Sequence, residues 1–253
     1  MEQCLQAGVP VPRVLALETV QLADGEFCAM VQECAAGVPL SEAMREMSDR
    51  DWAGICRQAG AMLGRIHTVP VGGYYRLSPD GSWDFPTFEA IAESSLHARA
   101  SERERLIGCG FSPAECEAMM GLLRESLQSS ADETPVLCHG DFAPDHIFVV
   151  DDLTITAVID FGEFQGGRPA VDFTQIAFWE RPVDVSAFAA GYPDQRWFGP
   201  DRTEKWALGR LGYLMGYCAY LADAERPEER DYMCDRLRET VGPLMARPSP
   251  QQS

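Results

Sequence analysis

The chain has 253 residues, 46% of them hydrophobic, so it is long enough to bury a full core as one large domain or two modest ones. It carries 21 basic and 39 acidic residues, and its formal net charge of −18 makes nucleic acid and anionic membranes poor partners. Nine cysteines without a Cys-x-x-Cys pair predict reduced thiols, not disulfides or a zinc site. With neither a signal-peptide pattern nor a long apolar run, the sequence predicts a cytoplasmic protein.

The first elements predicted along the chain are the end of a helix and a β-hairpin. Residues 1–7 are typical of the last turns of a helix. Residues 13–20 and 26–32 favour two strands around the Asp24-Gly25 turn, which is a strong hairpin signal.

Helices are predicted for most of the remaining chain. Apolar residues recur at three- and four-residue spacing from Trp52 to Ile66, which is typical of an amphipathic helix. Ser112-Pro113-Ala114-Glu115 forms a capping box with proline at the first helical position, so a helix is predicted to follow it. Residues 72–84 and 180–200 are expected to be loops. The further predicted helices cover residues 86–107, 171–179, 201–221 and 227–245.

Three short strands are predicted near the middle of the chain. Residues 136–138, 147–150 and 154–159 are apolar or β-branched runs, and the last two are expected to form a hairpin around the Asp151-Asp152 turn. A polar loop that contains Gly140 separates the first run from the hairpin. This pattern predicts a small ribbon inside a helical protein.

Two carboxylates flank this hairpin. Asp141 precedes it and Asp160 directly follows it, so the two side chains are expected to lie at one edge of the ribbon. Taken singly, each Asp is typical of a turn or a strand end. The ordered set of His-Gly-Asp141, then His146, then Val-Ile-Asp160-Phe-Gly favours a functional site instead. Paired carboxylates suit metal-assisted phosphoryl transfer, in which one orients the attacking hydroxyl and accepts its proton while the other holds Mg²⁺ against the phosphates.

The stretch resembles the catalytic loop and metal-binding motif of the aminoglycoside phosphotransferase family, which are small-molecule kinases with a protein-kinase-like fold. Their pattern is His-Gly-Asp-x-x-x-x-Asn, then Ile-Asp-Trp or Ile-Asp-Phe, then a further Asp before a helix. The resemblance implies an α+β fold with a mainly helical carboxyl-terminal lobe. By position it implies that Asp141 is the catalytic base, with His139 beside it in the catalytic set, and that Asp160 binds the metal. Asp172 is then expected to brace the catalytic loop.

His146 departs from this pattern, because most family members carry at this position an Asn that binds the second metal ion. Macrolide phosphotransferases resemble this chain in carrying His there. The resemblance therefore implies a metal-binding role for His146, with Mg²⁺ as the expected ion and Mn²⁺ as the alternative, since imidazole is a softer ligand than an amide oxygen.

The resemblance also predicts the lobes and the nucleotide site. Residues 1–36 correspond to a remnant of the amino-terminal lobe, residues 37–246 to the helical catalytic lobe, and residues 247–253 to a disordered tail. ATP or GTP is the implied cofactor. The base of the nucleotide is expected to contact the hinge at Glu33, Cys34 and Ala35, although a plain strand-to-helix loop would carry the same residues.

Parts of the family's pattern have no counterpart in this sequence. Upstream of Arg13 there is no room for two further strands, a glycine-rich phosphate loop, a strand lysine and a helix glutamate. The sole lysine, Lys205, follows Asp160 and cannot pair with the α- and β-phosphates. The resemblance covers residues 8–245. Either the start lies upstream or the phosphate clamp has been lost, and the helix remnant at residues 1–7 favours the first.

The expected substrate is a small, hydroxylated, cationic molecule, an aminoglycoside ahead of a macrolide. The runs that contain Glu163 and Glu180 resemble hygromycin-type phosphotransferases, and both carboxylates are candidates for binding ammonium groups. We expect no nucleic-acid or membrane partner, and a monomer or weak dimer.

Two other functional classes stay open at this point. A truncated or degenerate relative would bind its ligands without turnover. A metal oxygenase or hydrolase would use His139, Asp141 and His146 as a two-His, one-carboxylate site, but this hypothesis leaves the Asp160-Phe-Gly motif unexplained.

Overall fold

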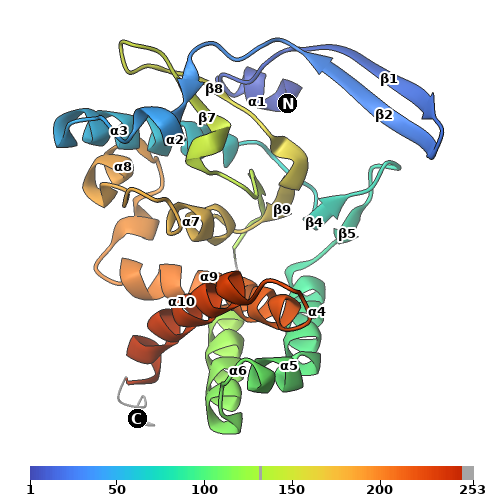
Figure 1. Ribbon diagram of the computed structural model, residues 1–253, viewed down its shortest axis with the longest axis vertical. Coiled ribbons are helices and arrows are strands. Elements are labelled where there is room, and N and C mark those ends of the chain that lie inside the picture. The colour runs from blue at the N-terminus through green and yellow to red at the C-terminus, as the bar shows by residue number, and fades with distance from the viewer. Residues whose placement is uncertain (131–132, 247–253) are drawn as a thin grey trace. The chain divides into compact units, whose positions relative to one another are not determined.

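The computed structural model describes residues 1–130 and 133–246. Its chain divides into two compact units, each made of two stretches: Met1–Val71 with Pro135–Arg196, and Gly72–Thr134 with Trp197–Ser253 (Figure 1). The sequential lobes predicted from the sequence, with a boundary after residue 36, stay a prediction. The predicted tail at residues 247–253 lies outside the described residues.

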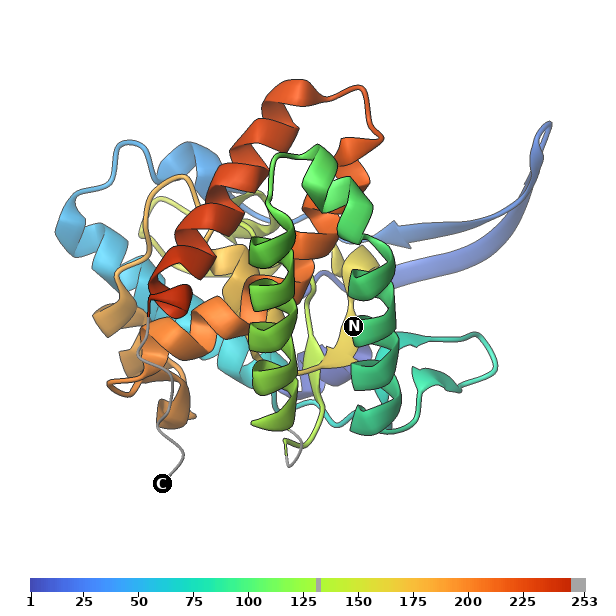
Figure 2. The ribbon, with the colours of Figure 1, turned by 90° about the horizontal axis from the view of Figure 1, so that it is seen from below.

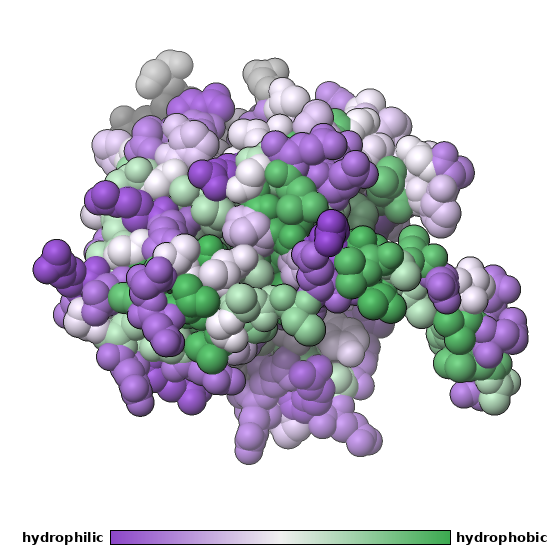
Figure 3. All heavy atoms as spheres, turned by 90° about the horizontal axis from the view of Figure 1, so that it is seen from above, coloured by the Kyte–Doolittle hydropathy of each residue, from purple (hydrophilic) through white to green (hydrophobic). Residues whose placement is uncertain are grey.

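The first unit begins with α1 (Glu2–Gln6) and the antiparallel pair β1 (Val14–Leu22) and β2 (Gly25–Gln32). Helix, hairpin and turn confirm the predictions for this stretch. The hairpin extends away from the helices of its unit as a curved arm (Figure 2). Many of its apolar side chains are exposed, among them Leu17 and Phe27, and apolar residues lie along the arm in Figure 3.

The hinge that follows the arm packs on the central hairpin. Strand β3 (Val38–Pro39) pairs antiparallel with β7 (Ile147–Val149), and β7 pairs with β8 (Ile155–Val158), as predicted for the last two strands. Gly37 permits this approach, because it has φ +94° and a Cβ there would lie 2.0 Å from the Val149 carbonyl oxygen. The short helix α2 (Leu40–Ala43) follows β3.

The remaining strands of the first unit place two loops side by side. Strand β6 (Val136–Cys138) does not extend the hairpin sheet; it pairs antiparallel with β9 (Gln165–Gly167), a strand that the sequence did not predict. The loop after β6 therefore lies against the segment that precedes β9. Their contact is tight at Gly140, which has φ +84°, because a Cβ there would lie 2.0 Å from the Glu163 carbonyl oxygen.

Three helices cover this arrangement. Helix α3 (Asp49–Ile66) is the predicted amphipathic helix, and Ser48 caps it. Helix α7 (Ala170–Ile176) matches the predicted helix after the motif, whereas α8 (Val185–Gly191) lies in a stretch predicted to be a loop. Glycines let α8 pack closely on α3. The largest fully buried side chains of this unit are Phe142, Phe173, Phe188, Leu40, Met44, Ile55, Leu63, Ile66, Ile147 and Ile176.

The second unit is mainly helical. The capping box at Ser112 forms as predicted, whereas the single helix predicted over residues 86–107 is two helices that meet at Glu102. A hairpin lies where a loop was predicted. The elements are β4 (Tyr74–Leu77), β5 (Trp83–Phe85), α4 (Phe88–Ser101), α5 (Arg103–Gly108), α6 (Pro113–Gln128), α9 (Arg202–Ala222) and α10 (Pro227–Met245). Within the described residues, no helix is both long and apolar enough to span a membrane.

Candidate active site

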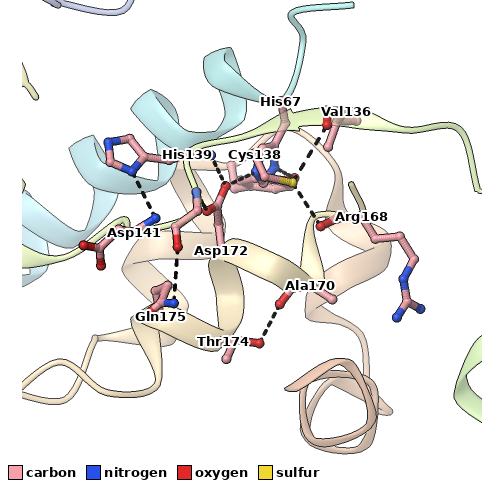
Figure 4. Close-up of polar contacts among 12 residues, drawn as sticks. His67, Val136, Cys138, His139, Asp141, Arg168, Ala170, Asp172, Thr174 and Gln175 are labelled. Carbon is pink, nitrogen blue, oxygen red and sulfur yellow. Dashed lines mark hydrogen bonds and ion pairs between the residues drawn. The ribbon is translucent and has the colours of Figure 1, made fainter. Parts of the chain in front are cut away.

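Asp172 holds the loop that follows β6. This carboxylate is fully buried at the start of α7, and it accepts hydrogen bonds from two successive backbone N–H groups, those of His139 at 2.9 Å and Gly140 at 2.8 Å. It also accepts one from Nε2 of His67 at 2.9 Å (Figure 4). A buried carboxylate that accepts several hydrogen bonds is a rigid anchor. The geometry agrees with the bracing role expected for Asp172.

The His139 ring is occupied by backbone groups on both sides. Its Nε2 lies 2.9 Å from the Ile159 carbonyl oxygen, and its Nδ1 accepts the Asp141 N–H at 3.2 Å. Both contacts are satisfied by a neutral ring with the proton on Nε2, and burial lowers the pKa of His139. The place of His139 in the catalytic set stays a prediction; in the structure its ring bridges the loop after β6 and the end of the β7–β8 hairpin. These contacts also oppose a two-His, one-carboxylate metal site, since neither ring nitrogen is available.

His146 lies between the two candidate carboxylates. Its Nδ1 is 2.9 Å from the Asp141 carbonyl oxygen and 3.5 Å from Oδ2 of the same residue. On the other side of the ring, Nε2 is 3.5 Å from Oδ2 of Asp160. The side chains of Asp141 and Asp160 are 40% and 59% exposed, so both can reach ligands from solvent. The structure therefore brings Asp141, His146 and Asp160 together.

Asp160 has an unusual backbone conformation that directs its side chain. Its φ of 60° and ψ of 61° place it in the left-handed region, which is uncommon for a residue other than glycine and is found at functional sites. Oδ1 accepts the Gly162 N–H at 3.3 Å, which leaves Oδ2 on the side of His146.

Asp160 and His146 offer two potential ligands for a divalent cation. Oδ2 of Asp160 and Nε2 of His146 are an oxygen and a nitrogen atom 3.5 Å apart, in side chains that are 59% and 19% exposed. The described residues also contain a compact set of potential ligands in His67, Cys138 and Asp172, all buried. That set is committed to structure, because the Asp172 carboxylate already accepts three hydrogen bonds.

The predicted hinge contacts lie at the opposite end of the central hairpin. Glu33 forms an exposed ion pair with Arg13 at 2.8 Å, and Cys34 is exposed. After Ala35, the chain is held by Thr156 of β8, whose hydroxyl donates to the Ala36 carbonyl oxygen at 2.6 Å. The hinge thus joins the sheet near Val149, whereas His146 directly precedes the other end of β7. One three-residue strand, about 10 Å long, separates them.

The two candidate substrate carboxylates differ in their surroundings. Glu163 is exposed in the short 3₁₀ helix that follows Asp160, so it lies beside the site. Glu180 is exposed and forms an ion pair with Arg45 at 3.5 Å, which reduces its availability for a cationic ligand.

Several supporting residues carried no sequence signal. Tyr192 lies in a stretch predicted to be a loop, yet its hydroxyl is 2.6 Å from Nδ1 of His67 and extends the Asp172 network. Burial raises the pKa of Tyr192, so the phenol stays protonated and donates a hydrogen bond to Nδ1 of His67. Trp179 donates to the Phe142 carbonyl oxygen at 2.9 Å, and Gln175 donates to that of Gly140 at 3.3 Å.

Comparison with known proteins identifies relatives of this arrangement. A family model described as "Phosphotransferase enzyme family" matches residues 2–206. An aminoglycoside 3'-phosphotransferase from Streptomyces fradiae is 25% identical over 224 residues, which cover 87% of this chain and 70% of that protein.

Solved structures share the fold at low sequence identity. An apo form of a thermostable mutant of aminoglycoside phosphotransferase APH(4)-Ia gives a TM-score of 0.70 at 17% identity, over 95% of this chain and 80% of that chain. A ternary complex of a thermostable mutant of the same enzyme with ADP and hygromycin B gives 0.66 at 16% identity, over 92% and 77%. The GDP complex of an aminoglycoside 2'-phosphotransferase-IIIa mutant gives 0.63 at 17%, over 94% and 76%. These likenesses confirm the α+β, kinase-like fold predicted from the motif.

Proposed function

Because this chain belongs to the phosphotransferase enzyme family, it is a kinase-like phosphotransferase, and we propose that it transfers the γ-phosphoryl group of ATP to a hydroxyl group of a small cationic molecule of the aminoglycoside type. One observation carries the proposal: Asp141 and Asp160, which are far apart in the sequence, each have Oδ2 3.5 Å from the ring of His146. Two carboxylates that meet in one solvent-accessible site suit phosphoryl transfer.

Asp141 acts on the attacking hydroxyl. Its carboxylate is 40% exposed, while its backbone N–H and carbonyl group are held by His139 and His146. It accepts the hydroxyl proton as the substrate oxygen bonds to the γ-phosphorus and the bond to the β,γ-bridging oxygen breaks, which releases ADP. Positioning and electrostatics supply most of the catalysis in this reaction class, so the fixed backbone matters as much as the carboxylate.

Asp160 and His146 would hold the divalent cation, which when bound would offset the negative charge of the phosphates. The base of the nucleotide would contact the hinge near Glu33, Cys34 and Ala35. This placement is supported by the sheet, in which β7 spans the distance between the hinge and His146.

A cationic substrate is supported by charge. The protein has a net charge of −18, and Glu163 is exposed directly after the Asp160 turn. Ammonium groups would form charge-assisted hydrogen bonds there. The relatives with solved complexes support the same class, since one of them binds ADP and hygromycin B. A macrolide remains the second candidate substrate, because this chain resembles the macrolide phosphotransferases in carrying a histidine at position 146.

The test is transfer of labelled γ-phosphate from ATP and GTP to a panel of aminoglycosides, macrolides and neutral sugars, with Mg²⁺ and with Mn²⁺. We expect turnover with the cationic compounds and none with neutral alcohols. The assay is run on this chain and on a version extended upstream, if the gene encodes one. Nucleotide binding without transfer to any compound by either version would establish the non-catalytic alternative.

A further inference from the structure

Three cysteines of the second unit meet where α5 ends against α9 and α10. Sγ of Cys109, the C-cap residue of α5, donates to the Cys218 carbonyl oxygen on α9 at 3.6 Å. The carbonyl oxygen of Cys109 accepts from Nη2 of Arg238 on α10 at 3.3 Å. Arg238 and Cys234 are one helical turn apart, so Cys234 lies on the face of α10 that contacts Cys109. The Cys234 thiol is a hydrogen-bonding neighbour of the other two thiols, and we call these three residues the cysteine cluster.

Cys109 is the member of the cysteine cluster that a small molecule can reach. It is half-buried, whereas Cys218 and Cys234 are 0% and 2% exposed. A single buried cysteine acts mainly as a small apolar residue, but an accessible thiol beside a second thiol can form a disulfide with it. Burial and then the Cys234 thiol raise the pKa of Cys109 to about 11, so this thiol reacts slowly at neutral pH. The guanidinium groups of Arg230 and Arg238 act in the opposite direction and favour its thiolate.

We infer that Cys109 and Cys234 form a dithiol that a small-molecule disulfide oxidises to an intramolecular disulfide. The Cys109 sulfur attacks one sulfur of the small disulfide, and one small thiol leaves with the Cys109 proton. The Cys234 sulfur then attacks the Cys109 sulfur of the mixed disulfide, and the second small thiol leaves with the Cys234 proton. Two protein thiols are oxidised, and the small disulfide is reduced to two thiols.

Cys109 suits this bond with Cys234 better than Cys218 does. Cys109 ends a helix and precedes Gly110, which has φ +87°, so its backbone lies in a turn that can adjust to the geometry of a disulfide. Cys218 is fixed inside the 21-residue helix α9 and is not reached by solvent.

The disulfide would fasten the two stretches of chain that make up the second unit. Cys109 belongs to Gly72–Thr134 and Cys234 to Trp197–Ser253. A bond between them closes a long loop and restricts the unfolded chain, so the oxidised protein should be the more stable form.

The experiment treats the full chain with oxidised glutathione overnight, blocks the remaining thiols with iodoacetamide and digests the protein with trypsin for mass spectrometry. Cleavage after arginine places Cys109, Cys218 and Cys234 in separate peptides, residues 106–124, 211–230 and 231–236. We expect peptide 106–124 linked to peptide 231–236, with fragmentation placing the bond at Cys109 and not at Cys116. The thermal midpoint should rise by about 10 °C, and dithiothreitol should reverse both changes.

Three variants and the pairing of the peptides decide the outcome. Cys109→Ser and Cys234→Ser should each abolish the linked peptides and the rise in the midpoint. Cys28→Ser, which removes an exposed thiol on β2, should retain both. A link between peptides 211–230 and 231–236, glutathione left as a mixed disulfide on Cys109, or no reaction of Cys109 would each overturn the inference. A linked protein with an unchanged midpoint would overturn the fastening role.

Discussion

At Gly140 the loop that carries Asp141 lies close against the segment that follows Asp160, so its substitution tests whether the separation of these two segments controls activity. It has φ +84°, and a Cβ there would lie 2.0 Å from the Glu163 carbonyl oxygen. The neighbour is backbone and cannot rotate away as a side-chain end would. In Gly140→Ala the segment that follows Asp160 must therefore move away from the loop that carries Asp141.

The expected losses of activity and of folding free energy in Gly140→Ala follow from this contact and from the positive φ. Ordinary contact begins near 3.4 Å, so the loops must separate by roughly 1.4 Å if the strain is not shared with other bonds. A misplacement of about 1 Å at a reaction centre can reduce the rate about a hundredfold. The positive φ adds about 1–2 kcal/mol of backbone strain, and the steric overlap adds about 1–3 kcal/mol to the loss of folding free energy.

Gly81 provides a matched control. It has φ +86°, but no atom lies within 4 Å of the position that a Cβ would take, so Gly81→Ala carries the backbone strain without the overlap. Phosphoryl transfer and thermal unfolding are measured for both variants. Gly140→Ala should lose about a hundredfold in kcat/KM relative to Gly81→Ala, and it should also be the less stable of the two. Equal activity in the two variants would refute the idea that the Glu163 contact sets the distance between the carboxylates.

Three further predictions concern the hydrogen-bonded side chains that support the loop after β6. Asp172→Ala leaves three buried hydrogen-bond donors without a partner, and each costs about 1–3 kcal/mol of folding free energy. This variant should therefore be mostly unfolded at room temperature. A midpoint of urea unfolding near that of the wild type would contradict this. Tyr192→Phe removes the donor to His67 and should cost about 1–2 kcal/mol in denaturant titration, and an unchanged midpoint would show that the bond adds nothing. Burial lowers the pKa of His139 below 6.5, so its contribution to stability is complete above pH 6.5 and is lost as the pH falls further. The gap in unfolding free energy between the wild type and His139→Asn should therefore shrink from about pH 7.5 to about pH 5.5, and a constant gap would contradict it.

Much of the site was predictable because its signals are local. The run from His139 to Asp160 places a loop, a hairpin and a turn in fixed order, and the β7–β8 hairpin is set by neighbouring residues. The sequence therefore predicted that Asp141 and Asp160 would lie at one edge. It also predicted the helices with strong periodicity or caps, such as α3 and α6.

The elements that the sequence did not predict depend on contacts between residues that are distant along the chain. Strand β9 is only three residues long and contains two glycines, so nothing in its composition favours a strand until it pairs with β6. Helix α8 is short and forms against α3, where Gly60 and Gly191 allow the two backbones to approach. The role of Tyr192 follows from that packing. The two hydrogen bonds of the His139 ring were not predictable either, because spacing alone does not reveal which backbone groups a ring contacts.

The most direct test of the account compares two aspartates of the same loop. Asp141 faces His146, whereas Asp145 is an exposed residue four positions later and has no assigned role. Transfer of γ-phosphate from ATP to the best substrate of the panel is measured for Asp141→Asn and Asp145→Asn. We expect Asp141→Asn to lose about a hundredfold or more in kcat, while Asp145→Asn should stay within about twofold of the wild type. Wild-type turnover in Asp141→Asn would contradict it.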